Sequence, residues 1–365
     1  MGTAIQESFK IDKLRRYMML CIIAVIYIKF IVIAVLDQSN IIIDILLYQL
    51  LLFTINYRRF SRTTFFLIIA LACLSVGNSA ARNLFLIFLC FSLFKELSIR
   101  YLVKANLVML LVVFIICTLF LLFGITKSAM FEQSLLDMRE RWDYGMRNPN
   151  RFALFVYSII LNVYLLFGQK YKITIFVTLL ITMIVYNYTQ SRTFVIAVIL
   201  LIILHYMRFI ISRSTLMKFF LQVSPILLLL IIFYISFNVD SFPEIDLLLT
   251  GRPKLYNYFL NSISLSNYVL GSSSINEEMM DSAYLHLFFE GGVLIYLYYC
   301  YIFYKAMSNA SIDDLRVCMP VFFSILALGL TESVFTFVLM FGNMIIWQIL
   351  FKLFRREPVY KDLYP

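Results

Sequence analysis

Acidic and imidazole side chains gather at the start of one apolar stretch, in DSAYLHLFFEGG (281–292). His286 and Glu290 are four residues apart, so a helix would place them on one face, where they can form a hydrogen-bonded pair. A carboxylate or an imidazole near a membrane surface can act as general base toward a hydroxyl group. Asp281 or Ser282 could equally cap the helix, and His286 could be an interior histidine, so these alternatives stay open. Glu332 is a further acid that we expect on the same side.

A set of arginines lies where loops meet apolar stretches. Arg192 follows Ser191 and Arg252 follows Gly251, with no acidic residue beside either in the sequence. An arginine at membrane depth is a candidate functional residue. Its planar fork of donors fits phosphate oxygens, and it keeps its charge. Several such forks on one face would suit a lipid-linked diphosphate, and the same face is expected to carry Arg147 and Arg151.

Other basic residues on that face have simpler interpretations. Arg139 and Arg141 lie among acids, so local ion pairing on a solvated surface explains them equally well. Arg82 could extend from a short helix end to the aqueous surface.

The elements that carry these residues are apolar. Of 365 residues, 62% are hydrophobic and 14% are charged, which is outside the range of soluble globular domains and typical of a chain in a bilayer. The cysteines lie in apolar runs without a CxxC pair, so neither a disulfide framework nor a zinc site is predicted. The chain has no external Asp-x-Asp motif, whose carboxylates a metal-dependent sugar transferase would usually need to hold its cation.

The predicted fold class is an all-α polytopic membrane protein. A spanning helix needs about 20 mostly apolar residues. Roughly twelve such stretches, some of them short, occur near 17–36, 41–57, 63–77, 82–94, 104–125, 152–168, 173–188, 193–211, 219–238, 284–304, 317–331 and 333–351.

The positive charges predict the orientation. Short cytoplasmic loops hold most Lys and Arg residues, and this pattern alternates along the chain when both termini are cytoplasmic. Orientation explains most of the net charge of +10, and the basic residues form no soluble patch, so we expect no nucleic-acid partner.

Two predicted external loops are long, at 126–151 and 239–283. Long loops in compact proteins are usually functional or disordered. In the first loop Leu135, Met138 and Trp142 recur at helical spacing, which predicts a helix lying in the membrane interface. No internal repeat is visible, so residues 1–365 are predicted to form a single membrane domain.

At these residues the chain resembles the bacterial O-antigen and capsule repeat-unit polymerases, which share a superfamily with the O-antigen ligases. The similarity covers most of the C-terminal two thirds, in RNPNRFAL (147–154), TQSRTFVIAVIL (189–200), LLTGRPKLYNYFL (248–260), VLGSSS (269–274), DSAYLHLFFEGGVL (281–294) and LGLTESVF (328–335). The resemblance implies a GT-C-type polymerase or ligase architecture and a metal-independent glycosyltransferase of the bacterial inner (cytoplasmic) membrane. Its substrate would be a polyprenyl-diphosphate-linked oligosaccharide, joined into O-antigen, capsular polysaccharide or exopolysaccharide on the external, periplasmic side.

The resemblance also implies roles for individual residues. Arg192 and Arg252 would bind the diphosphate without a metal or other cofactor, and the loop at 239–283 would form a lid over the site. Membrane lipids and a chain-length regulator would be further partners. The ligase branch typically has a catalytic histidine at the start of the helix that matches 281–300. Asp281 and Ser282 stand there in this chain, with His286 further along, which favours a polymerase and leaves the base open among Asp281, His286 and Glu332. A ligase-type glycan transferase and a flippase of the lipid-linked unit are the alternatives.

The charge pattern gives a first prediction. Reporter fusions should place 58–62, 208–218 and the C-terminus in the cytoplasm, and 126–151 and 239–283 outside, because the basic loops alternate. A cytoplasmic signal from a fusion within 239–283 would contradict an external site.

Overall fold

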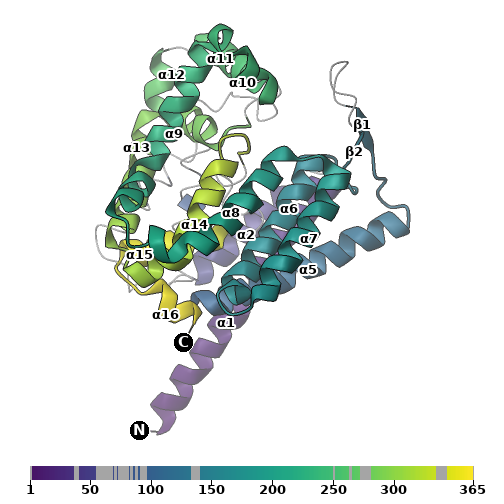
Figure 1. Cartoon of the computed structure of the whole chain (residues 1–365). Helices are drawn as coiled ribbons and strands as arrows, with labels where there is room; N and C mark the ends of the chain where they lie inside the picture. The colour runs from purple at the N-terminus through teal and green to yellow at the C-terminus, as the bar shows by residue number, and fades with distance from the viewer. Residues whose placement is uncertain are drawn as a thin grey trace. The chain divides into compact units, whose positions relative to one another are not determined.

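The computed structural model describes residues 2–36, 41–54, 97–132, 140–249, 251–262, 265–271, 281–333 and 343–364, with isolated positions between 69 and 90. The described chain is almost entirely helical and falls into two compact units (Figure 1). The first unit comprises 1–61, 88–194 and 339–348, and the second comprises 62–87, 195–338 and 349–365. The single membrane domain expected from the sequence stays a prediction.

The first unit contains long helices and one small hairpin. Its elements are α1 (Gly2–Phe30), the π-helical turn η1 (Ile31–Val35), α2 (Ile41–Thr54), α5 (Ile99–Leu122), β1 (Met130–Glu132), β2 (Glu140–Trp142), α6 (Pro149–Val163), the π-helical turn η3 (Tyr164–Gly168), α7 (Lys172–Thr189), the first residues of α8 (Arg192–Ile211) and the first part of α15 (Asn343–Phe354).

The second unit holds the rest of α8 and the remaining described helices. These are α9 (Thr215–Phe237), the 3-10 turn η4 (Val239–Ser241), α10 (Pro243–Leu248), α11 (Arg252–Ser262), α12 (Leu265–Leu270), α13 (Ala283–Asn309), α14 (Ile312–Leu328), the second part of α15 (Asn343–Phe354) and α16 (Val359–Leu363).

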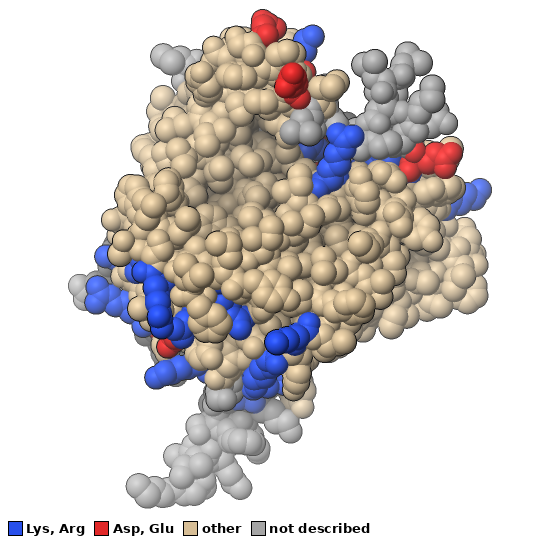
Figure 2. Space-filling model, in the orientation of Figure 1, with Lys and Arg blue, Asp and Glu red and all other residues tan. Residues whose placement is uncertain are grey.

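Among the described residues, seven helices are long and apolar enough to cross a membrane. They are Arg16–Ile33, Ile99–Leu122, Pro149–Gly168, Lys172–Thr189, Arg192–Ile211, Thr215–Phe237 and Ala283–Asn309. Large apolar side chains such as Val108, Ile115 and Met183 are exposed on these helices. Most of the surface in Figure 2 carries no Lys, Arg, Asp or Glu. A polytopic α-helical membrane protein has these properties, because lipid is the solvent for its outer surface.

Helices occupy most of the stretches predicted from the sequence. Ten of the predicted stretches coincide, wholly or in part, with α1, α2, α5, α6, α7, α8, α9, α13, α14 and α15. The stretches at 63–77 and 82–94 fall mostly outside the described residues, as does the start of the stretch at 333–351. The total of about twelve spanning helices therefore stays a prediction.

The segment 126–151 differs from its prediction. Residues 140–142 form a strand that pairs antiparallel with 130–132, with Met130 opposite Trp142. Trp142 therefore does not belong to an interfacial helix, while Leu135 and Met138 lie outside the described residues. Arg141 explains the difference: its side chain donates to the Thr189 carbonyl over 2.8 Å and to the Asn150 side chain, which fixes this strand against the ends of two helices.

The described part of the segment 239–283 is largely helical. It contains η4, α10, α11 and α12, and Gly251 makes the turn between α10 and α11 with a φ of +78°. Only glycine adopts that conformation without strain. The turn sets the first residue of α11, which is Arg252.

Buried polar side chains join helices within the first unit. The Tyr27 hydroxyl of α1 donates to Asn106 of α5 over 2.7 Å, and Asn106 donates to Asn162 of α6 over 3.2 Å. All three side chains are buried. Such bonds fix the register of helices in a bilayer, where apolar side chains gain little by leaving lipid.

In the second unit, side-chain hydroxyls satisfy backbone carbonyls. Pro225 lies inside α9 and has no N–H, so the Leu221 carbonyl loses its helical donor. The Ser224 hydroxyl donates to that carbonyl over 2.7 Å. Tyr296 of α13 donates to the Pro225 carbonyl over 2.6 Å. These bonds keep polar backbone groups paired at membrane depth and attach α13 to α9.

The buried network generates a stability prediction. Asn106→Leu keeps the size of the side chain but removes the bonds to Tyr27 and Asn162. We expect the free energy of unfolding to fall by about 1–2 kcal/mol, since interhelical hydrogen bonds in membranes contribute roughly 0.6 and at most about 1.7 kcal/mol each. Unfolding in mixed detergent micelles measures this. Val108→Leu, on the exposed face of the same helix, is the control, and equal stability of the two variants would contradict the assignment.

Candidate active site

Arg252 is the centre of the polar cluster in the second unit. It is the first residue of α11, and its side chain is 14% exposed. One guanidinium nitrogen donates to the Thr331 carbonyl over 2.6 Å. The other lies 3.0 Å from the Asp281 carboxylate and 3.5 Å from the Glu332 carboxylate. Arg252 therefore joins the start of α11, the residue that precedes the N-cap of α13 and the segment after α14.

The charge of Arg252 is secured by its neighbours. Burial alone would lower the pKa of the guanidinium, but the carboxylates of Glu332 and Asp281 outweigh burial and raise that pKa above its ordinary value. The cluster consequently holds a permanent cation between two acids, and each acid gains a charged hydrogen-bonding partner.

The two acids differ in access to solvent. The Asp281 side chain is 46% exposed, whereas the Glu332 side chain is 8% exposed. The N-cap of α13 is Ser282, and Asp281 precedes it. The Ser282 hydroxyl lies 3.4 Å from the Gly329 carbonyl, which also accepts the Ala283 N–H over 2.9 Å. Asp281 is thus not the capping residue, and its carboxylate is the accessible acid of the cluster.

His286 and Glu290 share a face of α13, as their spacing predicted. The distance from His286 Nδ1 to the Glu290 carboxylate is 3.3 Å. Both side chains are buried, His286 to 1% exposure and Glu290 to 5%. Protein encloses the imidazole in this conformation, which favours the interior interpretation of His286 over direct contact with a substrate.

The helix that carries these groups is broken at Gly292. Its φ is +71° and its ψ is 173°, which are not helical values. A Cβ atom there would lie 2.3 Å from the Val269 carbonyl oxygen and 2.7 Å from the Gly271 backbone nitrogen. The end of α12 therefore packs directly on the backbone of α13, and Tyr268 of α12 packs edge-on against Phe288 and Phe289. Only glycine fits at position 292.

Two residues of the cluster were not predicted from the sequence. Tyr256 stands one helical turn after Arg252 and is 3% exposed. Burial raises the pKa of its hydroxyl more than nearby Arg252 lowers it, so the phenol stays protonated. Spacing of four from Arg252 is the only sequence signal for Tyr256. Thr331 takes part through its backbone carbonyl, for which no side-chain pattern gives a signal.

The other predicted phosphate ligands belong to the first unit. Arg192 is the exposed first residue of α8. Arg147 is exposed with a left-handed φ of 61°. Arg151, in the first turn of α6, lies 3.4 Å from the Met146 carbonyl. Convergence of Arg147, Arg151 and Arg192 with Arg252 stays a prediction.

No group of three or more His, Cys, Asp or Glu side chains is placed to hold a metal ion within the described part of the chain. Metal-independent chemistry remains a prediction.

Comparison of the chain with protein-family models, with curated proteins and with solved structures finds no match.

The break in α13 generates a prediction about stability. Gly292→Ala should lower the free energy of unfolding by the cost of a left-handed residue, about 1–2 kcal/mol, plus about 1–3 kcal/mol for overpacking against the Val269 and Gly271 backbone. Thermal unfolding in detergent measures both terms together.

The matched control is Gly124→Ala. Gly124 has a similar φ of +69°, but a Cβ atom there meets nothing within 4 Å, so only the first cost applies. Equal destabilisation by Gly292→Ala and Gly124→Ala would show that α12 does not press on α13.

Proposed function

We propose that the protein is a repeat-unit polymerase, a glycosyltransferase that joins polyprenyl-diphosphate-linked oligosaccharides. The observation that carries the proposal is the cluster in which the Arg252 guanidinium lies between an accessible acid, Asp281, and a buried one, Glu332. A group that binds a diphosphate and a group that takes a proton are the two that glycosyl transfer to a hydroxyl requires. The resemblance of the surrounding segments to polymerases supplies the substrate class.

The proposed reaction is a direct displacement. Asp281 accepts the proton of an acceptor sugar hydroxyl, and the hydroxyl oxygen forms a bond to the anomeric carbon of the donor. The bond from that carbon to the diphosphate breaks, and its electron pair leaves with the diphosphate. Arg252 stabilises the developing negative charge. The configuration at the anomeric carbon is inverted.

The charges of the cluster link these two events. Two carboxylates compete for one guanidinium, which disfavours an incoming diphosphate while both acids are ionised. Proton transfer to Asp281 removes one competitor at the moment when charge develops on the leaving group. The Arg252 donors are then available to phosphate oxygens, so acid–base work and leaving-group stabilisation occur in one cluster.

The wider setting belongs to the same proposal. We place the protein in the bacterial inner membrane with about twelve spanning helices, a GT-C-type architecture and the cluster on the external side. Arg147, Arg151 and Arg192 supply further positive charge toward the lipid-linked diphosphate, and a chain-length regulator is a candidate protein partner.

A flippase of the lipid-linked unit is the second candidate, and one observation favours it. Discontinuous helices with enclosed polar groups are common in transporters. Helix α13 has both features, because it is broken at Gly292 and carries the buried His286–Glu290 pair.

Purified protein supplied with lipid-linked repeat units in detergent separates these functions. A ladder of saccharide lengths on the lipid supports a polymerase. Transfer of finished glycan to a different acceptor indicates a ligase. Movement of the unit across a vesicle membrane without new glycosidic bonds indicates a flippase and would contradict the proposal.

Arg252→Lys tests the leaving-group role. Lysine keeps the charge but cannot make a two-pronged contact with phosphate oxygens or reach Thr331 and Asp281 in the same geometry. We expect polymer yield to fall by about tenfold or more, because a charge-assisted hydrogen bond contributes about 1.5–3 kcal/mol. The ladder assay at matched expression measures it. Full-length polymer from this variant would make Arg252 an orienting residue only.

Asp281→Asn tests the base. Ser282 rather than Asp281 is the N-cap, so the start of α13 should be kept. Arg252 loses one counter-charge but keeps Glu332, so we expect normal insertion and a modest loss of thermal stability. Loss of the ionisable carboxylate should slow transfer by about 10² to 10⁴ and leave single repeats or very short chains.

His286→Ala is the companion variant. If Asp281→Asn polymerises normally and His286→Ala does not, the base is His286. If both stable variants are fully active, Glu332 becomes the remaining candidate.

A further inference from the structure

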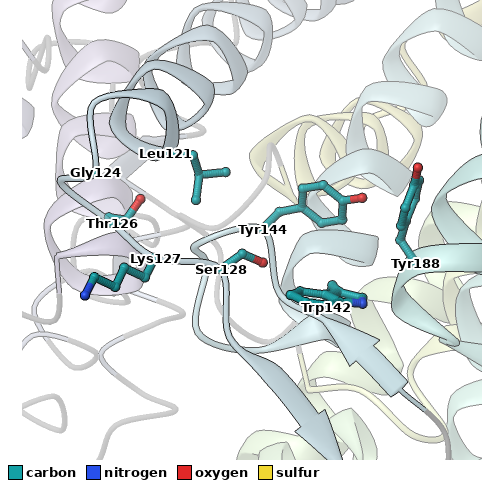
Figure 3. A pocket seen from close by; sticks show the side chains of 8 residues that line it. All are labelled: Leu121, Gly124, Thr126, Lys127, Ser128, Trp142, Tyr144 and Tyr188. Carbon is teal, nitrogen blue, oxygen red and sulfur yellow. The ribbon is translucent and has the colours of Figure 1, made fainter.

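The first unit contains a second candidate binding site, formed by residues other than those of the Arg252 cluster. It is a cavity of about 560 Å³ between the C-terminal end of α5, the segment around the hairpin and the C-terminal end of α7. Its lining residues, drawn in Figure 3, are Leu121, Gly124, Thr126, Lys127, Ser128, Trp142, Tyr144 and Tyr188. A volume of this order is that of small-molecule sites, which span roughly 300–1,000 Å³.

The side chains that line the cavity combine the apolar faces of aromatic rings with polar groups at the ring edges. Trp142, Tyr144 and Tyr188 each present an apolar ring and one polar group, and Leu121 is the only aliphatic side chain in the set. Figure 3 shows the Lys127 side chain pointing away from the three rings. The cavity therefore suits a ligand that is apolar on its faces and polar at its edges, and suits a phosphate or an acyl chain less well.

The backbone of Tyr144 is held in an unusual conformation. Its φ is +52°, and a left-handed conformation costs a non-glycine residue about 1–2 kcal/mol. The Tyr144 ring stacks on Phe152 with centroids 4.5 Å apart and meets Tyr188 edge-on at 5.5 Å. Strain of this kind persists where the surroundings over-determine it, and it clusters at ligand sites.

Hydrogen bonds to the neighbouring Asp143 hold the backbone around Tyr144 in place. Asp143 is 1% exposed, and one carboxylate oxygen accepts the backbone N–H groups of Ala129 and Gly145, each at 2.9 Å, and lies 3.3 Å from the Ser128 hydroxyl. The bond from Arg141 to the Thr189 carbonyl ties the same segment to the end of α7. The cavity wall is thus preorganised, which lowers the entropic cost of binding.

We infer that this cavity is a saccharide subsite that holds pyranose rings of the oligosaccharide. The inference rests on the proposed function for the source of the glycan. Polarised C–H groups on the face of a pyranose fit the negative face of an aromatic ring, and its equatorial hydroxyls reach the ring tips and Ser128. Burial and the nearby Tyr188 raise the pKa of Tyr144 to about 12, so its hydroxyl stays a donor at neutral pH.

The test uses tryptophan fluorescence, because the chain has two tryptophans, Trp142 and Trp347. In the full-length Trp347→Phe protein in detergent, Trp142 is the only tryptophan, so the emission reports on the cavity. The probe is the free oligosaccharide released by mild acid from the lipid-linked repeat units of the producing cells. We expect a saturable change in emission. In the same background, Tyr188→Ala should weaken binding by up to about tenfold, since an aromatic contact contributes about 0.5–1.5 kcal/mol.

Tyr171→Ala is the matched control, an exposed tyrosine at the other end of α7 that does not line the cavity. Unchanged binding in this variant supports the subsite. Equal weakening by Tyr171→Ala and Tyr188→Ala would overturn it. A response to inorganic phosphate or to vesicles of anionic lipid, with none to the oligosaccharide, would also overturn it and assign the rings to anion or membrane contact.

The outcome is separable from that of the proposed function, because binding requires no turnover. Saturable binding that depends on Tyr188, in a preparation that makes no polymer ladder, would keep the subsite and reject the polymerase. A ladder from protein that does not bind the free oligosaccharide would reject the subsite alone.

Discussion

A buried guanidinium must be neutralised where it stands, and in the second unit this requirement organises the candidate site. Arg252 is 14% exposed, and a charge so enclosed is tolerated only with hydrogen-bonded counter-charges. It obtains them from Asp281 and Glu332, which are distant in sequence from each other and from Arg252. The start of α11, the approach to α13 and the end of α14 therefore meet at one point, and the same contacts leave Asp281 as the accessible acid.

Glycine and hydroxyl side chains make this arrangement possible in an apolar setting. Gly251 makes the turn that begins α11 at Arg252, and Gly292 lets α12 press on the backbone of α13. Ser224 satisfies the carbonyl that Pro225 leaves without a donor. In the first unit, Asp143 holds a strained Tyr144 in place at a cavity lined by rings. Both units thus combine polar groups held in fixed positions with apolar outer surfaces.

The long apolar stretches were predictable from the sequence, because a helix is the only open-chain element that satisfies its own backbone in lipid. The placement of His286 and Glu290 on one face, 3.3 Å apart, was predictable from their fixed spacing on one helix. The pairing of 130–132 with 140–142 was not predictable, since Arg141 fixes its strand through contacts distant in the chain. The roles of Thr331 and Tyr256, and the cavity lined by Trp142, Tyr144 and Tyr188, likewise depend on tertiary contacts. Such contacts cannot be read from the order of residues in the sequence.

We propose that Arg252 exchanges its carboxylate partners for a diphosphate, so a short-chain polyprenyl diphosphate should bind the purified protein through this guanidinium. Titration calorimetry on wild type, Arg252→Lys and Glu332→Gln requires no turnover. We expect Arg252→Lys to weaken binding by about tenfold or more, while Glu332→Gln, which removes a competing acid, should not weaken it. Equal affinity of wild type and Arg252→Lys for the diphosphate would show that no such exchange occurs and would leave Arg252 as a structural partner of the two acids.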